Sequence, residues 1–401
     1  MTGPRIFLTH GACAAERLVA DRVAELHDAA RRDLALLARP VRIVVPSVSL
    51  RDHLAAALVE RCGALAGVQV STLFSVALEL LHAAGHGAGR VTALFDVVAR
   101  RCARTEPVLR ARLDDLDDGY AVVAAAVRDL LDAGFEPVHA AALEELLADD
   151  GPALATGDEI ARAGAVVRVA AAAEESLAAL GLTPRSALLG AARDALEAGG
   201  PELLPARELL VHGFADATGV VTDLLESLLR VLDGTLVLDR PPAAAGGHES
   251  AHTERLALRL MQVARAEDVP SSAAPSPPAA ARVVLLAAPD PEAEARAVAQ
   301  RVRRLLAEGV RPERIGVVAR DLAGCAVVLR RHFRVLGVPF SGGRAPGPLG
   351  PAGRDLALLA ELLRRGPALA LERWLDALAD LDPSRRSEVR LALLARGASR
   401  L

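Results

Sequence analysis

The stretch VRIVVPSVSLRDHLAAALVE (41–60) contains two successive patterns that together indicate the fold class. Its first half is rich in β-branched residues, which is typical of a buried strand. Pro46 and Ser47 mark a junction, because proline interrupts strand pairing and serine is a favoured N-cap of a helix. The second half continues with apolar residues at helical spacing. A strand followed at once by a helix predicts a βα unit.

The same unit occurs on both sides of this stretch. RIFLT (5–9) has the composition of a short buried strand, and we expect a helix from about residue 14 to 39, where Pro40 ends it. VQVST (68–72) is a third strand candidate, and the apolar pattern of residues 73–85 again predicts a helix. Three βα units in series favour parallel strands with helical crossovers, which is an α/β fold.

The middle of the chain interrupts this alternation. From about residue 90 to 200 only helical patterns are evident, and we interpret this part as a helical insertion. Strand patterns resume at RELLVHGF (207–214) and TLVLD (235–239). We therefore assign residues 1–89 and 201–240 to a first α/β domain, with residues 90–200 as its helical insertion.

A change of composition follows. Residues 241–281 hold two loops rich in Pro, Ala, Ser and Gly around one amphipathic helix, and we expect a linker region here. Strand patterns return at RVVLLAAP (282–289) and IGVVARD (315–321), each followed by a helical pattern, and VPFSGG (338–343) closes the series. Residues 282–401 are thus expected to be the start of a second α/β domain, incomplete because its strands are few.

Composition limits the chemistry. The chain has 401 residues, a net charge of −4 and 52% hydrophobic residues, enough for a large core. Every one of its 47 basic residues is arginine, which excludes mechanisms that require a lysine, including a phosphate-loop lysine. Aromatic residues make up only 2%, so base stacking is not expected to dominate any nucleic-acid binding. The segment from 282 to 344 is basic, with 12 arginines against 6 acidic residues.

The cysteines and the apolar runs bear on the compartment. Four cysteines are far apart and form no CxxC pair, which argues against a zinc site or a disulfide framework. Reduced cytosolic thiols are the ordinary state of such cysteines. No signal-peptide pattern and no apolar run of about 18 residues occurs, so we expect a cytoplasmic protein without membrane association. The four are Cys13, Cys62, Cys102 and Cys325.

The first strand-to-helix junction is the place where a phosphate-binding loop would lie. Such a loop needs glycines and a lysine followed by Ser or Thr. Here THGACAAERL (9–18) offers only Gly11, and it places Glu16 near the lysine position and Arg17 near the Ser/Thr position. A carboxylate there would repel a triphosphate. The loop predicts a degenerate nucleotide site, or simply an ordinary βα turn.

Catalytic and metal-binding patterns are not evident either. The strand of residues 207–214 carries His212 where an acidic residue of a nucleotide hydrolase would be expected. A metal-bound pair of His212 and Asp216 is conceivable, but a lone histidine at a strand end is more often structural. We predict no catalytic residue, no metal site and no cofactor within these residues.

Several polar residues follow the predicted strands and are candidates for DNA phosphate contacts. Ser47 and Arg51 stand at one strand-to-helix junction, where a hydroxyl, helix amides and a guanidinium can hold a phosphate. Thr72 and Phe74 stand at the next junction, and Phe74 could stack on a base. Arg320 ends a predicted strand, a place where α/β folds meet ligands. The alternatives are N-caps for the hydroxyls and a core position for Phe74.

In this order the pieces resemble the N-terminal part of AddB/RecC-type subunits of bacterial helicase-nuclease complexes, which are built on a superfamily 1 helicase plan. The resemblance covers nearly the whole chain, and the order of the pieces carries it more than any single motif. The matching pieces are RIFLTHG, RIVVPSVSLRDHL, VQVSTLFSVALELL, HGFADATGVVTDLLESL, EAEARAVAQRVRRLLAEGV with IGVVARD, and LGVPFSGG.

The resemblance implies P-loop-helicase-like parallel sheets, DNA end processing in double-strand-break repair and recombination, binding of single-stranded or duplex-end DNA, and an AddA-type helicase-nuclease partner. It implies ATP, Mg²⁺ and an iron–sulfur cluster only for the complete complex. The chain departs from the family at its degenerate loop and at His212. The family's PD-(D/E)XK nuclease segment has no counterpart in these residues. We therefore expect a non-catalytic, DNA-guiding subunit or a fragment of one.

Three alternatives stay open. The chain could be a truncated PD-(D/E)XK exonuclease subunit whose nuclease domain is missing. It could be an active helicase with an unusual phosphate loop, although the lack of lysine argues against this. It could also be an α/β interaction protein without any nucleic-acid role, which its overall negative charge permits.

Overall fold

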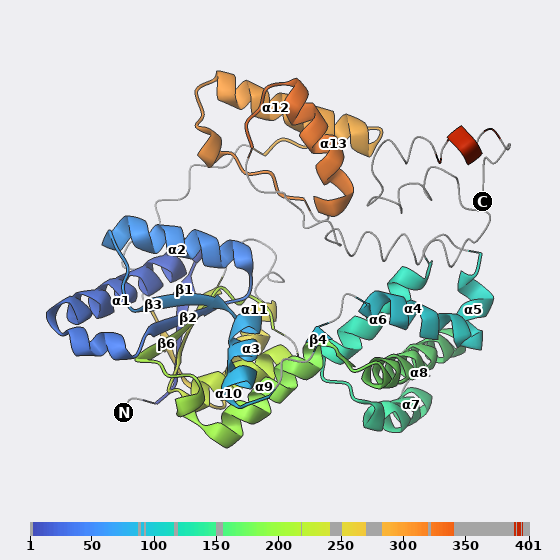
Figure 1. The fold of residues 1–401 in the computed structure, drawn as a ribbon, viewed down its shortest axis with the longest axis horizontal. Helices are drawn as coiled ribbons and strands as arrows, with labels where there is room; N and C mark the ends of the chain where they lie inside the picture. The colour runs from blue at the N-terminus through green and yellow to red at the C-terminus, as the bar shows by residue number, and fades with distance from the viewer. Residues whose placement is uncertain are drawn as a thin grey trace. The chain divides into compact units, whose positions relative to one another are not determined.

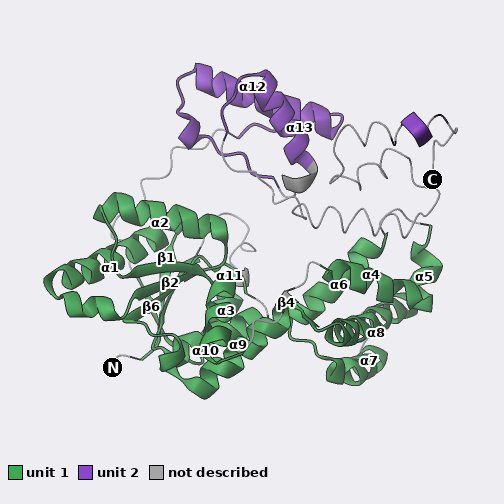
Figure 2. Cartoon of the chain, viewed as in Figure 1, with its two compact units in different colours: residues 1–277 green, residues 278–401 purple. Residues whose placement is uncertain are grey.

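The computed structural model describes most of the first 340 residues. The chain forms two compact units, residues 1–277 and residues 278–401 (Figure 2). We describe each unit by itself. The described residues are 3–86, 90–91, 94–115, 119–149, 155–217, 219–240, 251–269, 283–319, 322–340, 389, 391–393 and 395.

A six-stranded, all-parallel sheet forms the centre of the first unit (Figure 1). Its strand order is β3-β2-β6-β7-β1-β8, so the chain starts near one edge, crosses to the other and returns. The α/β class expected from the sequence is confirmed. The strands are β1 (Arg5–His10), β2 (Val41–Val45), β3 (Val68–Thr72), β6 (Glu208–His212), β7 (Thr235–Arg240) and β8 (Arg265–Asp268).

Helices cover both faces of this sheet. Helices α1 (Ala12–Arg32) and α2 (Val48–Cys62) pack on one face, which we call the α1/α2 face, over Ile43, Leu210 and Val237. The opposite face has the larger core, into which α3, α9, α10 and α11 pack. These helices are α3 (Leu73–Ala83), α9 (Arg185–Gly199), α10 (Gly219–Val231) and α11 (Ala251–Leu260).

The strands have apolar residues on both faces because each face is covered. Along β6, Leu210 belongs to the core of the α1/α2 face, whereas Leu209 and Val211 belong to the opposite core. Successive side chains of a strand point to opposite faces, so this alternation fixes the face of every residue on β6 and β7.

The first helix is shorter than the sequence pattern predicts. Helix α1 ends at Arg32, and the short 3₁₀ helix η1 (Leu34–Ala38) follows it. The break occurs because Asp33 is extended and its carboxylate accepts a hydrogen bond from the Ala35 amide. An aspartate that bonds to a nearby amide competes with continued helix formation.

Within the expected insertion of residues 90–200, the described helices α4 to α8 form a bundle with its own core, whereas α9 packs into the larger core of the sheet. Contrary to the expectation of helices alone, two-residue strands β4 (Arg90–Val91) and β5 (Leu182–Thr183) pair in parallel. The helices are α4 (Phe95–Thr105), α5 (Pro107–Leu113), α6 (Gly119–Asp132), α7 (Ala140–Asp149) and α8 (Gly157–Ala179), with 3₁₀ helices η2 (Pro137–His139) and, after α9, η4 (Pro201–Leu203).

Part of the segment expected as a linker belongs to the sheet. Within residues 241–281, α11 packs into the larger core through Leu256 and Leu260, and β8 pairs with β1 at the sheet edge. The sequence of β8, RAED, gave no strand signal because its residues are mostly charged. Charged residues on a short edge strand limit unwanted pairing with other chains.

The second unit contains α12 (Pro291–Ala307), the 3₁₀ helix η5 (Pro312–Arg314) and α13 (Leu322–Val335) (Figure 1). The two helices pack on each other through Ala299, Val302 and Phe333. Of the strands predicted at residues 282–289 and 315–321, the described residues 283–289 and 315–319 are not assigned to any strand. In the described part of this unit, the helices of the predicted βαβα pattern are present without strands between them.

Candidate functional site

The carboxyl ends of β1, β2 and β3 make the edge of the sheet at which a ligand would be expected. Each of these strands leads within a few residues into the N-terminus of α1, α2 or α3. Helices α1 and α2 lie on the α1/α2 face, whereas the helices that follow the neighbouring strands β6 and β7 lie on the opposite face. A crevice forms at the carboxyl ends of neighbouring strands whose connections leave in opposite directions.

The junction between β1 and α1 is held by main-chain bonds. Gly11 has φ of 95°, which favours glycine, and its N–H donates to the Arg240 carbonyl at 3.1 Å. Arg17, expected near the Ser/Thr position of a phosphate loop, donates from Nε to the Cys13 carbonyl at 3.2 Å. Gly11 caps α1 without a side-chain hydrogen bond, so no side chain of the cap covers the first amides of this helix.

At the next junction, Ser47 is the N-cap of α2. Its hydroxyl accepts a hydrogen bond from the Leu50 amide at 3.2 Å. Arg51 lies one turn into the helix, where its guanidinium contacts the carboxylate of Asp52 at 2.9 Å. The side chain of Arg51 keeps 39% of its surface exposed, so a phosphate could approach it, but in competition with Asp52.

The third junction has a more buried cap. Thr72 is 8% exposed, and its Oγ1 accepts a hydrogen bond from the Ser75 amide at 3.2 Å. Phe74 packs partly against the larger core, and the guanidinium of Arg185 lies over its ring at 5.2 Å from the centroid. One face of this ring already carries a cation–π contact, which reduces the room for stacking on a base. Arg320, the fifth candidate, lies outside the described residues.

A cluster that the sequence analysis missed joins three elements on the α1/α2 face. Glu16 of α1 accepts or shares a hydrogen bond with His53 of α2, with Oε2 and Nε2 3.0 Å apart. His212, the last residue of β6, follows Leu210 by two positions and so lies on the same face. The charges of Glu16 and His53 both act on it.

Burial dominates the chemistry of His212. The residue is 6% exposed, and its Nδ1 has no hydrogen-bond partner. Burial lowers the pKa of His212 below its ordinary value of 6.5, with Glu16 opposing and His53 reinforcing the shift. The imidazole is therefore neutral at physiological pH, and it does not supply a cation for a phosphate.

Asp239 of β7 lies on the same face. It is two residues beyond Val237, which pairs with His212 in the parallel ladder. Burial raises the pKa of Asp239, while the backbone amide of Gly11 and the charge of His10 lower it. Its Oδ1 is buried without a partner. The two strand ends beneath α1 thus hold two buried polar atoms that no described residue satisfies.

The pair of His212 and Asp216, weighed as a metal site, gains no third ligand. Within the described ranges, no group of three or more His, Cys, Asp or Glu side chains is placed to hold a metal ion. Among the helices that the structure describes, none is both long enough and apolar enough to cross a membrane.

No protein-family model matches this sequence, and comparison with curated proteins finds no significant match.

Proposed function

We propose that the first unit binds single-stranded nucleic acid along the carboxyl edge of its sheet, as a helicase-like subunit that does not hydrolyse nucleotides. The observation that carries the proposal is that three helix starts, capped by Gly11, Ser47 and Thr72, follow the carboxyl ends of strands of one parallel sheet, with α1 and α2 on one face and α3 on the other.

Helix starts suit a phosphate chain because their first amides have no partner within the helix and carry a partial positive charge. Helix starts at the carboxyl ends of β1, β2 and β3 can each meet a phosphate of one nucleic-acid strand without contacting base edges. The binding should therefore be tolerant of sequence and dependent on salt. Ser47 is the candidate hydroxyl and Arg51 the candidate guanidinium, because both are at the surface of this edge.

The same edge is poorly suited to a nucleoside triphosphate. Glu16 places a carboxylate in the second turn of α1, and no residue of the chain is lysine. The nearest basic partners are already engaged, since His53 bonds to Glu16 and Arg17 bonds to the main chain. Separate phosphates can bind at the starts of α2 and α3, away from Glu16, whereas a triphosphate bound at the start of α1 would meet its carboxylate.

The resemblance to AddB/RecC-type subunits suggests what this DNA binding would serve in the cell. The chain would guide a DNA strand beside an AddA-type motor during double-strand-break repair and recombination. ATP, Mg²⁺ and an iron–sulfur cluster would then belong to other parts of the complex. This cellular role is proposed from the order of the sequence motifs, whereas the binding itself is proposed from the sheet and its helix starts.

Fluorescence anisotropy of labelled single-stranded DNA, measured over a salt series with and without ATP, tests the proposal. We expect binding that weakens steeply with salt and is unchanged by ATP. Arg51→Ala should weaken binding and reduce the salt slope by about 1. Arg61→Ala is the matched control, because Arg61 is on the same helix, similarly exposed and paired with Asp21, but at the far end.

Three results would count against the proposal. Absence of binding at low salt would favour an interaction protein without a nucleic-acid role. Equal loss in the Arg51 and Arg61 variants would show that general charge, not the sheet edge, is responsible. Binding that changes with ATP would contradict the interpretation of the first junction.

A further inference from the structure

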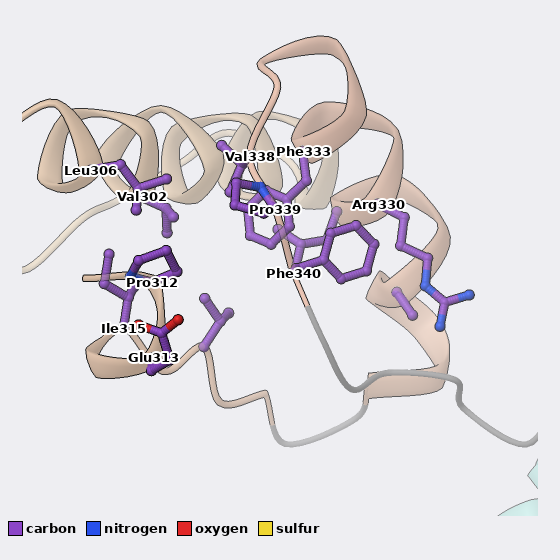
Figure 3. Close-up of a pocket in the computed structure, with 13 residues that line it drawn as sticks. Val302, Leu306, Pro312, Glu313, Ile315, Arg330, Phe333, Val338, Pro339 and Phe340 are labelled. Carbon is purple, nitrogen blue, oxygen red and sulfur yellow. The ribbon is translucent and has the colours of Figure 1, made fainter. Parts of the chain in front are cut away.

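Two cavities, one in each unit, differ in their chemistry. The cavity of the second unit is walled largely by apolar side chains, among them Val302, Phe333 and Phe340 (Figure 3). The cavity of the first unit lies between the end of α6, α8, α9 and the start of α10, and we call it the α6–α10 cavity. It encloses about 370 Å³, a size typical of small-molecule sites. Its lining combines apolar and charged side chains, which gives it the means to select a ligand.

Two carboxylates of this cavity have no cationic partner. Glu136, in the turn after α6, and Glu174, on α8, make no ion pair with any described residue. Glu174 Oε2 is buried and accepts no hydrogen bond from the described residues. Burial raises the pKa of Glu174, and the charge of Glu136 raises it further. Uncompensated negative charge is therefore concentrated in this part of the cavity.

The carboxylates that α9 and α10 contribute are already neutralised. Asp194 accepts a hydrogen bond from the guanidinium of Arg193 at 2.7 Å. Asp223 lies 3.6 Å from the same guanidinium and also forms an ion pair with Arg259. The charge that remains to be balanced in the cavity thus belongs to the α8 carboxylate and to the one in the turn after α6.

A buried hydroxyl also lines the cavity without a partner. Ser186, near the start of α9, is 6% exposed, and its hydroxyl makes no hydrogen bond with a described residue. Apolar walls are supplied by Leu131, Phe135 and Val220. A carboxylate oxygen can only accept hydrogen bonds, and a serine hydroxyl can accept them as well. The cavity therefore presents hydrogen-bond acceptors beside an apolar surface.

These features define the chemistry of an occupant. It must donate hydrogen bonds to Glu174 Oε2 and to the Ser186 hydroxyl, and it must carry positive charge. Water could donate to both atoms, but it would leave two carboxylates uncompensated. A metal ion is less suitable, because no three His, Cys, Asp or Glu side chains in the described ranges are placed to hold one. An ammonium or guanidinium group meets both conditions, and the ring of Phe135 favours a cation nearby.

We propose that the α6–α10 cavity binds a small organic cation, in which a primary ammonium or guanidinium group is carried by an aliphatic or aromatic body. The cation donates to Glu174 and Ser186 within the field of Glu136, and its body packs on the apolar walls. Because these walls come from both the helical bundle and the helices of the sheet, the occupant stabilises the contact between them. This proposal does not depend on nucleic-acid binding at the sheet edge.

Isothermal titration calorimetry of the full-length chain tests the charge requirement with three related compounds. Phenethylamine, phenethyl alcohol and hydrocinnamate share a phenyl body but carry positive, zero and negative charge. We expect only the amine to bind, with a Kd of about 1 mM or below. Equal binding of the alcohol would overturn the proposal, because the cavity would then select only the apolar body. Failure of both phenethylamine and agmatine, a guanidinium compound, to bind would also overturn it.

A further titration identifies the source of the cation. Nα-acetyl-lysine amide carries the same ammonium group on the side chain of a peptide unit. Binding of this compound more tightly than phenethylamine would support the proposed chemistry and assign the cation to a protein side chain. The reverse order would support it and assign the cation to a free amine.

Three substitutions test whether the binding occurs in this cavity. Glu174→Gln should weaken amine binding by about 10-fold or more and Ser186→Ala by about 3-fold or more, because each removes an acceptor. Gly190→Leu should abolish binding, since Gly190 lines the cavity and a Cβ there meets open space. Glu175→Gln is the matched control, because Glu175 is an exposed residue of α8 that does not line the cavity. Thermal melts verify that each variant folds, and unchanged affinity in folded Glu174→Gln and Gly190→Leu variants would overturn the proposal.

Discussion

Glu16 Oε2 lies 3.0 Å from His53 Nε2 and joins the N-terminal parts of α1 and α2 across the α1/α2 face. The contact places a carboxylate at the sheet edge where phosphates are proposed to bind. Behind it, His212 is buried and neutral, so His212 does not offset the charge of Glu16. The guanidinium of Arg51 on α2 carries positive charge at the same edge.

Glu16→Gln should tighten single-stranded DNA binding by about 2- to 5-fold at low salt, because it removes one repulsive charge near the phosphates. The gain should disappear in high salt. The pair is partly exposed, so the free energy of unfolding should change by no more than about 1 kcal/mol. Anisotropy titrations at two salt concentrations, with a urea melt, measure both effects.

Glu25→Gln is the control for this change, because Glu25 is exposed on the same helix and pairs with Arg22 at 3.0 Å. Equal tightening in both variants would mean that net charge, and not position, controls the affinity.

Stability should fall as the pH drops through the unfolded pKa of histidine, about 6.5. Burial lowers the pKa of His212 in the folded state, so the unfolded chain binds the extra proton first. Its contribution to folding is complete above about pH 6.5 and is lost progressively below it. His212→Gln should flatten the pH dependence of the urea midpoint between about pH 5 and pH 7.

His82→Gln tests whether any histidine has this effect, since His82 is exposed near the end of α3. A pH profile that is unchanged by His212→Gln would contradict the interpretation.

Glu79→Ala should destabilise the first unit by about 2–4 kcal/mol, because it leaves a buried guanidinium without its counterion. Arg42 on β2 is 7% exposed and bonds to both oxygens of Glu79, at 2.9 and 2.7 Å. Its Nε also donates to the Pro205 carbonyl at 2.9 Å. Urea denaturation measures the change.

Glu202→Ala is the comparison for that variant. Glu202 also pairs with an arginine, Arg39, but at 3.4 Å and with both side chains exposed, so its loss should cost less than about 1 kcal/mol. Similar costs in the two variants would show that burial of Arg42 is not the cause.

Gly219→Ala should lower stability by more than about 1 kcal/mol. Gly219 begins α10 with φ of 43°, and a Cβ there would come within 2.2 Å of the Asp132 carbonyl oxygen. The contact lies where α10 meets the end of α6 in the helical insertion. Gly190→Ala in α9 has open space and ordinary helical geometry, and it should be neutral or stabilising. Thermal melts that rank the two variants in the reverse order would refute this.

The sheet was predictable where local signals agreed. At β2 and β3, β-branched strands end at Ser47 and Thr72, whose hydroxyls cap the next helices as the sequence indicates. Strand β8 was missed because the RAED sequence carries no apolar alternation, and only its pairing with β1 makes it a strand. Residues 283–288 are the opposite case. Their sequence strongly predicts a strand, but among the described residues they pair with no other strand.

The site was less predictable because its contacts depend on packing. Ser47 and Arg51 could be placed at a helix start, but the contact of Arg51 with Asp52 competes with any phosphate. The approach of Glu16 to His53 requires α1 and α2 to lie together on one face, over a sequence separation of 37 residues. The strand alternation from Leu210 to His212 was the one available signal that His212 faces these helices.

The position of β1 has a consequence for synthesis on the ribosome. Its two neighbours in the sheet are β7 and β8, so the first strand made must wait for residues 235–240 and 265–268 to leave the exit tunnel. The helical insertion, with its separate core and local contacts, can fold well before that. During this interval RIFLTH has neither of its neighbouring strands, and chaperone binding to residues 5–10 would protect it from aggregation.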